Sequence, residues 1–387
     1  MLRTKVGYSM NEDSFTSGAM ATKNALIGNS SKIGFLYTSC KSNIKDVVKG
    51  VRSQSDIPII GCTSAGAVMI PEGIVASEKG YATMMSMADV NLTVGVACHE
   101  AGKNARQIGR AVALEAVKNA NMSVAPTYFY MVASPKEEED YLMGIQDVIG
   151  RVPFFGGSAA DDSVEGKWKI ICNEKVFSDG LAVAFFYTSN DIITKFTGDY
   201  RETKNMGTIT EVKDDRTLVT INHERSLEKY AEWTKEEINT LRGTNLLVSS
   251  VFTPFGIKNP TGDITLIRHP MIGNNNNTMN LGNKIVEGTT VIQMEATRDE
   301  LINATGETLK DLRKSLKTEP AGYILIHSSG RKLGIGNRLE EVHKQLVKEA
   351  KGVPFIVPFT FGEYGYSENS ANSCGGLMLS FTGFGKE

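Results

Sequence analysis

The sequence contains little cysteine and little histidine. Its five cysteines are scattered through 387 residues, and none stands in a C-x-x-C pair. An odd, dispersed set of thiols argues against a disulfide framework and a zinc ribbon, and it indicates a reducing, cytoplasmic compartment. The five histidines form no H-x-x-x-H or H-E-x-x-H pattern, so we predict no dedicated metal site.

The chain also lacks the features of proteins that bind nucleic acid or enter a membrane. The formal net charge is −2, and no run of basic residues occurs. No stretch approaches the roughly 18 consecutive apolar residues that a membrane-spanning helix needs. The first residues, Met1–Val6, do not contain the apolar core of a signal peptide. We therefore expect no nucleic-acid partner, no membrane insertion and a cytoplasmic location.

The sequence does contain one pattern that occurs three times. Each copy runs strand, helix, strand, helix, strand, and ends in a small polar loop. The first strands of the three copies begin at Val6, Val94 and Val291. The closing loops are Cys62–Gly66, Gly157–Asp162 and Phe361–Gly365. Because α/β proteins bind ligands in loops at strand ends, these loops are the first candidates for a site.

The periodicity within the copies predicts the fold class. In the segments expected to be helical, apolar residues recur with a period of about 3.6 residues, as at Ile44, Val47, Val48 and Val51. The step between the second and third strands leaves room for a crossover helix, as parallel neighbours need. Consecutive strands with short turns follow each loop and indicate antiparallel hairpins. We therefore predict the α/β class (mixed α+β), with mixed parallel and antiparallel sheets that are covered by helices and built from repeated β-α-β-α-β units.

The sequence pattern changes near Thr208. The segments from Thr208 and from Leu218 predict a hairpin that turns at Asp214 and Asp215. A polar helix over Leu227–Leu241 and an apolar strand over Leu246–Phe252 follow. A chain of this length suggests two domains. We place the boundary near residue 222, so that residues 1–222 hold two repeats and residues 223–387 hold the third.

Two of the loops approximate known catalytic or nucleotide-binding motifs. Gly61–Gly66 has the glycines of a phosphate loop, but no Gly-Lys-Ser/Thr follows it and Pro71 interrupts the segment. Gly156–Ala160 approximates the nucleophile elbow G-x-S-x-G, but a turn rather than a helix is expected after Ser158. A hydrolase that uses Ser158 or Cys62 therefore stays an alternative without a recognisable base nearby. The plain alternative is that these glycines allow close packing of the backbone.

Charged residues of the second and third repeats are further candidates. Asp161 and Asp162 could hold a ligand amine, bind a cation or cap their turn. Glu363 lies at the end of an apolar strand, so its carboxylate is expected to be partly buried and to need a partner. A ligand ammonium or the guanidinium of Arg331 would serve, and a structural ion pair is the alternative.

His269 is the candidate for an alternative with a cofactor. Haem iron needs only one strong protein ligand and an apolar pocket, so a lone histidine can bind it. His269 stands in an extended turn before Pro270. Our first expectation is that the protein has no cofactor, and haem ligated by His269 is the alternative.

The series of motifs resembles the FIST (F-box and intracellular signal transduction) family. Three segments resemble its N-terminal FIST domain: Gly61–Gly66, Phe155–Asp161 and Asp179–Val183. Three others resemble its C-terminal FIST domain: Arg268–Pro270, Val286–Thr290 and Phe361–Gly365. The resemblance spans almost the whole chain in the right order. The chain departs from the family at Ala67–Val68, where an acidic or polar residue is common, and at Ser328–Arg331, where a cysteine often precedes the arginine.

The resemblance implies a cytosolic sensory module that binds small ligands, with amino acids proposed, and passes a signal to partner proteins. Some bacterial members are described as haem proteins that sense nitric oxide and act on a histidine kinase. A histidine kinase or another signalling protein is therefore the implied partner. A conclusion that rested on the family's cysteine would not carry over to this chain.

Together these observations favour a signal-transduction sensor without catalysis. We expect it to bind an amino acid or a similar small polar metabolite in a cleft between the two domains, with closure of the cleft as the output. Acidic side chains would meet the ammonium of a zwitterion, and Arg331 with backbone N–H groups would meet its carboxylate. The predicted ligand-binding residues are Cys62, Thr63, Ser64, Gly156, Gly157, Ser158, Asp161, Asp162, Arg331 and Glu363.

Overall fold

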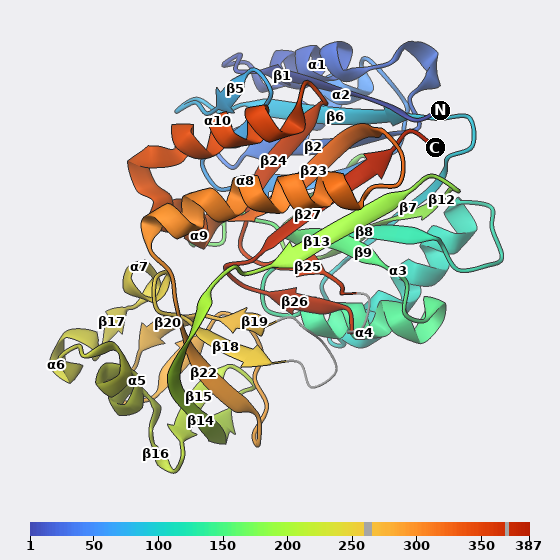
Figure 1. Cartoon of the computed structure of the whole chain (residues 1–387). Coiled ribbons are helices and arrows are strands. Elements are labelled where there is room, and N and C mark those ends of the chain that lie inside the picture. Colours follow the sequence, from blue (N-terminus) through green and yellow to red (C-terminus); the bar gives the residue numbers. More distant parts are fainter. Residues whose placement is uncertain (259–264, 368–370) are drawn as a thin grey trace.

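The computed structural model describes residues 1–258, 265–367 and 371–387. Three six-stranded sheets form one part of the molecule, and a fourth sheet lies at one end of it (Figure 1). We call residues 1–197 with 298–387 the repeat body, and residues 201–296 the β-insert. The mixed α/β class predicted from the sequence is confirmed.

The first two repeats share one order of elements and one sheet topology. The first contains β1 (Arg3–Ser9), α1 (Ser14–Ala25), β2 (Ile33–Ser39), α2 (Ile44–Arg52), β3 (Ile59–Ser64) and β6 (Ala82–Ala88). The second contains β7 (Thr93–Glu100), α3 (Ala105–Asn119), β8 (Tyr128–Ala133), α4 (Glu138–Ile149), β9 (Phe154–Ser158) and β12 (Gly180–Tyr187). Their strand orders are β1-β6-β2-β3 and β7-β12-β8-β9. The parallel pairs β2–β3 and β8–β9 confirm the predicted crossover units.

The third repeat has the same topology, but its first strand comes from an unexpected place. β13 (Ile192–Thr197) takes that position beside β27 (Leu379–Gly385), in the order β13-β27-β23-β24. The prediction that the third copy begins at Val291 is wrong, because β22 (Thr290–Glu295) pairs with strands of the β-insert. The remaining elements are α8 (Arg298–Ser315), β23 (Pro320–Ser328), α9 (Ser329–Ile335), α10 (Leu339–Ala350) and β24 (Phe355–Thr360).

Hairpins exchanged between the repeats join the three sheets in a ring. The first repeat supplies β4 (Val68–Ile70) and β5 (Gly73–Val75) to β24 of the third. The second supplies β10 (Ile170–Cys172) and β11 (Lys175–Phe177) to β3 of the first. The third supplies β25 (Glu363–Gly365) and β26 (Ser373–Gly375) to β9 of the second. The chain therefore crosses from one sheet to the next directly after each third strand.

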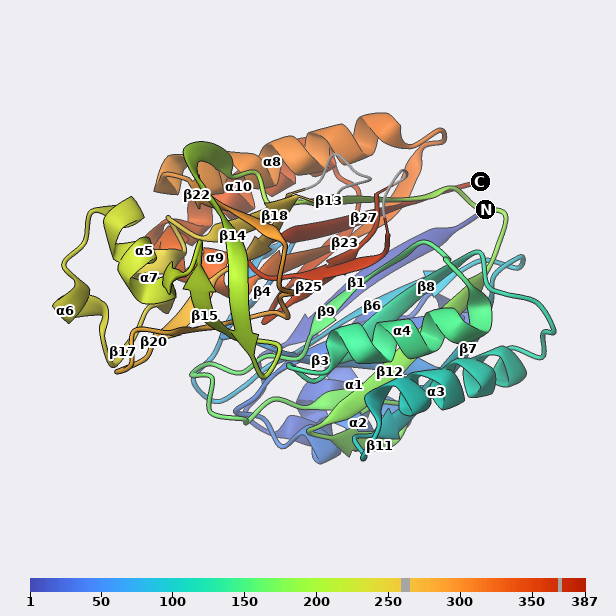
Figure 2. The same cartoon turned by 90° about the horizontal axis from the view of Figure 1, so that it is seen from below.

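Side chains that alternate along the strands separate a shared core from three outer cores. Phe35, Tyr130 and Ile324 lie in one cluster where the three sheets face one another. Their sequence neighbours, such as Leu36 and Phe129, lie in separate clusters with the helices. Each sheet is thus covered on its outer face by one helix pair, namely α1 and α2, α3 and α4, or α8 and α10 (Figures 1 and 2).

The β-insert has its own hydrophobic core and connects β13 to α8. Its strands are β14 (Arg201–Lys213), β15 (Thr217–Ile221), β16 (Glu224–Arg225), β17 (Thr244–Asn245), β18 (Phe255–Lys258), β19 (Thr265–Arg268), β20 (Pro270–Gly273), β21 (Met279–Leu281) and β22. Its helices are α5 (Ser226–Thr234), α6 (Ile238–Leu241) and α7 (Leu247–Ser250). The predicted boundary near residue 222 falls between β15 and β16, and the division into domains there stays a prediction.

Local predictions within the β-insert have mixed outcomes. The hairpin is confirmed as β14 and β15, and Asp214 and Asp215 at its turn adopt positive φ angles. The strand over Leu246–Phe252 is wrong, because α7 lies within that run. A short apolar run does not distinguish a strand from a buried helical turn, which is the physical reason for the error. Within residues 1–258, 265–367 and 371–387, none of the helices combines the length and the apolar character that a membrane span requires.

Candidate functional site

The segments in which the chain passes from one sheet to the next are residues 65–67, 159–169 and 361–362, and we call them the three crossings. They meet at the end of the repeat body that faces the β-insert. Backbone hydrogen bonds join them: Ala65 N–H to Phe359 O (3.0 Å), Ser158 N–H to Gly362 O (2.8 Å) and Ala160 N–H to Thr63 O (3.0 Å). These contacts bring the three closing loops of the sequence pattern together. The neighbouring side chains therefore come from residues that are far apart in the sequence but lie in one place.

The predicted residues at the ends of β3 and β9 lie in the interior. The hydroxyl of Ser64 donates to Ala67 O (2.6 Å) and accepts from the Phe359 amide (2.8 Å). The hydroxyl of Ser158 forms a hydrogen bond of 2.6 Å with the hydroxyl of Tyr364. Thr63 accepts from the Lys169 amide (2.9 Å), and Cys62 is buried in the shared core, which raises the pKa of its thiol. These side chains hold the crossings together.

The two predicted glycines of β9 allow close approach of the backbone. Gly156 has a φ of 149°, and a Cβ atom there would lie 1.8 Å from Met131 O. A Cβ atom on Gly157 would lie 2.7 Å from Gly362 O in the neighbouring crossing. Any larger residue would therefore push β9 away from β8 or β25.

Asp161 and Asp162 differ in their environment. Asp161 is buried, and its carboxylate accepts from the amides of Val164 (2.5 Å) and Lys167 (2.7 Å), among others. It therefore shapes the loop between β9 and β10, which is the capping role that the sequence left open. Asp162 is more exposed, and its carboxylate lies 3.6 Å from Lys41 Nζ.

Arg331 and Glu363 are both fully buried behind the crossings. The guanidinium of Arg331 donates to the carbonyls of Gly198, Leu301 and Leu377. Glu363 accepts from the Thr360 hydroxyl (3.1 Å) and from the Met378 amide (2.8 Å). Burial raises the pKa of Glu363 to about 8. Both side chains are engaged by the protein itself.

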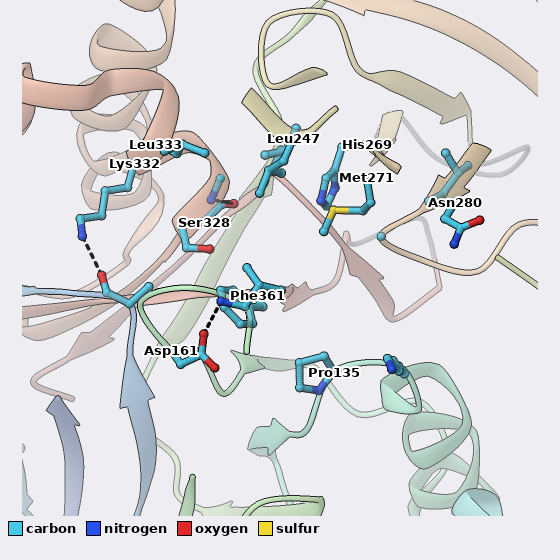
Figure 3. A pocket seen from close by; sticks show the side chains of 18 of the residues that line it. Pro135, Asp161, Leu247, His269, Met271, Asn280, Ser328, Lys332, Leu333 and Phe361 are labelled. Atoms are coloured by element: carbon cyan, nitrogen blue, oxygen red, sulfur yellow. Dashed lines mark hydrogen bonds between the residues drawn. The ribbon is translucent and has the colours of Figure 1, made fainter. Parts of the chain in front are cut away.

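A cavity of about 650 Å³ lies between the crossings and the β-insert (Figure 3). The repeat body contributes Ala65, Gly66, Asp161, Asp162, Trp168, Ser328, Lys332 and Phe361, among others. The β-insert contributes Arg216, Leu247, His269, Met271, Asn280 and Leu281, among others. Most of the large side chains on both sides are apolar or aromatic. The volume is in the range of cavities that bind small organic molecules.

Only part of the predicted site lies at this cavity. Asp161, Asp162 and His269 line it. Cys62, Thr63, Ser64, Gly156, Gly157, Ser158, Arg331 and Glu363, all within the described ranges, lie outside its lining. They belong to β3, β9, α9 and β25, whereas residues at the tips of the crossings, such as Gly66 and Phe361, line the cavity. A role of the eight in binding stays a prediction.

Lys332 on α9 is the cavity residue that sequence reasoning missed most clearly. Its Nζ donates to Ala65 O (2.7 Å) and lies 5.2 Å from the centre of the Phe359 ring. Among the described residues, no carboxylate forms an ion pair with it. Burial lowers the pKa of this amine. Its position directly after Arg331 was the only signal in the sequence.

His269 is a titratable residue of the β-insert that lines the cavity. It is 6% exposed, and burial together with the charges of Arg268 and Arg216 lowers its pKa to about 4. The imidazole is therefore neutral at physiological pH. Its Nδ1 is buried without a hydrogen-bond partner among the described residues.

Arg216 joins the β-insert to the N-terminal end of α4 at the cavity edge. Its guanidinium lies 2.9 Å from Glu139 and 3.4 Å from Glu138, and it donates to Lys136 O (2.7 Å). Glu138 is buried, which raises its pKa to about 7, and the charge of Glu139 adds to the shift. Lys284 adds an ion pair with Asp140.

The metal-binding capacity of the site is limited. Within residues 1–258, 265–367 and 371–387, no cluster of three or more His, Cys, Asp or Glu side chains could hold a metal ion. A haem needs a single neutral imidazole in apolar surroundings, and His269 with Leu247, Met271 and Phe361 fits that requirement. Lys332 at the same cavity could meet a propionate.

Comparisons with known proteins identify the family models that this chain matches. The FIST N domain model matches residues 32–224, and the FIST C domain model matches residues 226–366. No curated protein matches the chain. Solved structures of PurL from T. maritima, complexed with AMPPCP and with ATP, are 8% and 10% identical and have TM-scores of 0.24 and 0.22. These alignments cover 99% of this chain and 72% of PurL. TM-scores this low do not establish a shared fold.

Proposed function

The chain belongs to the FIST family, whose domains are associated with signal transduction and small-ligand sensing, and we propose that its cavity is the ligand site of a sensor. One observation carries the proposal. All three repeats and the β-insert contribute residues to one cavity, although these residues are widely separated in the sequence. A molecule bound there would contact both parts of the protein.

We propose further that the ligand is an amino acid or a similar small polar metabolite. Lys332 and Asp162 flank Gly66, because a Cβ atom on Gly66 would lie 2.7 Å from Lys332 Nζ and 3.8 Å from Asp162 Oδ1. Opposite charges on the two sides of Gly66 suit a zwitterion, whose carboxylate would bind Lys332 and whose ammonium would bind Asp162. These two residues replace Arg331 and Glu363 as the proposed charge partners, because Lys332 and Asp162 line the cavity whereas Arg331 and Glu363 do not.

The proposed output is a change in how the β-insert sits on the repeat body. The β-insert connects to the body through the junctions β13–β14 and β22–α8, and through the contact of Arg216 with Glu139. A ligand with different affinities for two arrangements would shift the balance between them. A histidine kinase or another signalling protein would read that shift.

Isothermal titration with the common amino acids tests the zwitterion. We expect at least one to bind the wild type, and Lys332→Gln and Asp162→Asn each to weaken it by about tenfold, since each removes one charge-assisted hydrogen bond. Asp46→Asn on the exposed face of α2 is the matched control and should leave binding unchanged. Flat titrations with all amino acids, together with no rise in melting temperature, would refute this ligand class.

A haem-based nitric-oxide sensor is the second candidate, and His269 favours it. Haem, when bound, would supply the iron that takes up the gas. The protein would supply the neutral imidazole of His269 and the apolar wall around it. Reconstitution with haemin should then produce a Soret band that His269→Ala abolishes and that His223→Ala, at an exposed turn, retains. A Soret band that is the same in all three proteins would exclude His269 as the ligand.

The hydrolase alternative gains no support from the geometry. The Ser158 hydroxyl is hydrogen bonded to Tyr364, and Cys62 lies in the shared core with a raised thiol pKa. A nucleophile needs access to substrate and a base that can take its proton. A covalent probe for serine and cysteine nucleophiles should label neither residue.

A further inference from the structure

We infer that the ligand of this cavity is an amphipathic organic anion: its anionic group pairs with Lys332, and an extended apolar body packs against Phe361, Leu247 and Met271. This inference rests on the proposed function of the cavity and adds the chemistry of the ligand. It admits an amino acid only if the side chain is large and apolar.

The size and lining of the cavity require the apolar body. Leu247 and Met271 from the β-insert face Phe361 from the third crossing across the cavity (Figure 3). A small, fully polar metabolite would leave most of these surfaces in contact with water, so it would gain little from burial of apolar area. A molecule with an extended apolar body would fill the volume of about 650 Å³ and contact both walls.

The charges around the cavity require the anionic group. The guanidinium of Arg216 is already paired with Glu139 at 2.9 Å. The carboxylate of Asp161 is already occupied by backbone amides. Lys332 is bonded to a backbone carbonyl and lies against the face of Phe359, and among the described residues it forms no ion pair. The charge of Asp162 acts on it from a distance, but that carboxylate is in contact with Lys41 at 3.6 Å. An anion in the cavity would give this partly buried ammonium a direct partner.

A purely structural role for Lys332 is the competing explanation. Its bond to Ala65 O ties α9 to the first crossing and could be its whole purpose. The two roles differ in what they predict for ligands. A structural lysine would affect charged and neutral ligands equally, whereas a ligand-binding lysine would favour the anion.

Two fluorescent probes with one aromatic framework separate these roles. 1-Anilinonaphthalene-8-sulfonate carries a sulfonate, and N-phenyl-1-naphthylamine lacks it. We would titrate both into the full chain and take the ratio of their affinities for each variant. This ratio removes effects that a substitution has on both probes alike.

We expect the ratio to fall by about tenfold or more in Lys332→Gln, because the sulfonate loses its charge-assisted partner. Lys332→Arg should retain most of the preference for the anion. Lys348→Gln, which removes the same charge from an exposed residue of α10 outside the cavity lining, should leave the ratio unchanged. Met271→Trp should weaken both probes, because the larger side chain occupies the space of the apolar body.

The remaining outcomes overturn one claim or both. If both probes bind, Met271→Trp weakens both, and the ratio is the same in wild type and Lys332→Gln, the cavity binds ligands but the anion claim is wrong. If neither probe binds, or if Met271→Trp affects neither, the cavity does not take an amphipathic anion and this inference is wrong. The titrations with amino acids then decide separately whether the proposed function fails as well. Circular dichroism of each variant confirms that it is folded.

Discussion

The two walls of the cavity are built differently. Behind the wall from the repeat body lies a buried layer, Ser64, Ser158, Arg331 and Glu363, whose polar groups hydrogen bond mainly to backbone groups of neighbouring segments. The wall from the β-insert presents apolar side chains, His269 and Arg216. Among the described residues, a buried nitrogen without a hydrogen-bond partner occurs on both sides, namely Arg331 Nε and His269 Nδ1. The difference suggests that the repeat body fixes the position of the site, while the β-insert is the part that a ligand can reorganise.

Removal of the buried guanidinium of Arg331 should have the largest effect on the free energy of unfolding. Arg331→Ala would leave three carbonyls without their donor and open a cavity in the repeat body. We expect a loss of about 3–5 kcal/mol in the free energy of unfolding, measured by urea denaturation. Arg338→Ala, which removes only surface ion pairs, is the control and should cost under about 1 kcal/mol. Equal losses in the two variants would contradict a special role of the buried layer.

Glu363→Gln tests the same layer through pH. The folded-state pKa of about 8 lies above the ordinary value of 4.5, so the folded protein binds the proton more tightly than the unfolded chain does. The contribution of Glu363 to stability is therefore fully present below pH 4.5 and is lost as the pH rises toward 8. The loss is at most roughly 1.4 kcal/mol per pH unit.

The amide that replaces this carboxyl group in Glu363→Gln cannot titrate, so the variant should lose stability less steeply than the wild type as the pH rises from about 5 to about 8. Urea denaturation at several pH values measures both slopes. Parallel curves for the two proteins would show that the carboxyl group of Glu363 is not linked to folding.

A smaller effect is expected where the β-insert meets α4. Arg216→Met removes the ion pair with Glu139 and the bond to Lys136 O, at a cost of about 1–3 kcal/mol. Hydrogen exchange should become faster in β14, β15, β20 and β21 and stay unchanged in the repeat body. A uniform increase across the whole chain would mean that the two parts unfold as one unit.

His269→Leu should have the smallest effect on stability. Its pKa of about 4 lies below the ordinary 6.5, so its contribution is present above pH 6.5 and is lost as the pH falls through 4. At pH 7 the free energy of unfolding should change by no more than about 1 kcal/mol. At pH 4 the variant should retain stability that the wild type loses. Thermal unfolding at both pH values measures this, and a large loss at pH 7 would make His269 a structural residue.

Much of the repeat body could be predicted from the sequence, because its helices and strands follow clear periods. The first strand of the third repeat could not be predicted. Both β13 and β22 look like strands in the sequence, and nothing in either one indicates which of them pairs with the sheet of the third repeat. The exchange of hairpins between repeats was also hidden, because short antiparallel strands such as β4 or β25 do not indicate the sheet that they join.

The candidate cavity lies beside the loops that the sequence singled out, but only some of the residues predicted for the site line it. The polar and glycine residues near the loops, such as Ser64 and Glu363, stood out in the sequence because polar groups are unusual after apolar strands. The crossings bury them, and burial forces them to bond to the protein itself. Leu247, Met271 and Phe361 carry no sequence signal that separates the wall of a cavity from an ordinary core, so only the structure identifies them.

A crystal structure of the protein with 1-anilinonaphthalene-8-sulfonate tests the central claim most directly. The account predicts the naphthalene ring between Phe361 and Met271, with the sulfonate at Lys332 Nζ. A probe that binds outside this cavity, or that contacts only one of its two walls, would contradict it.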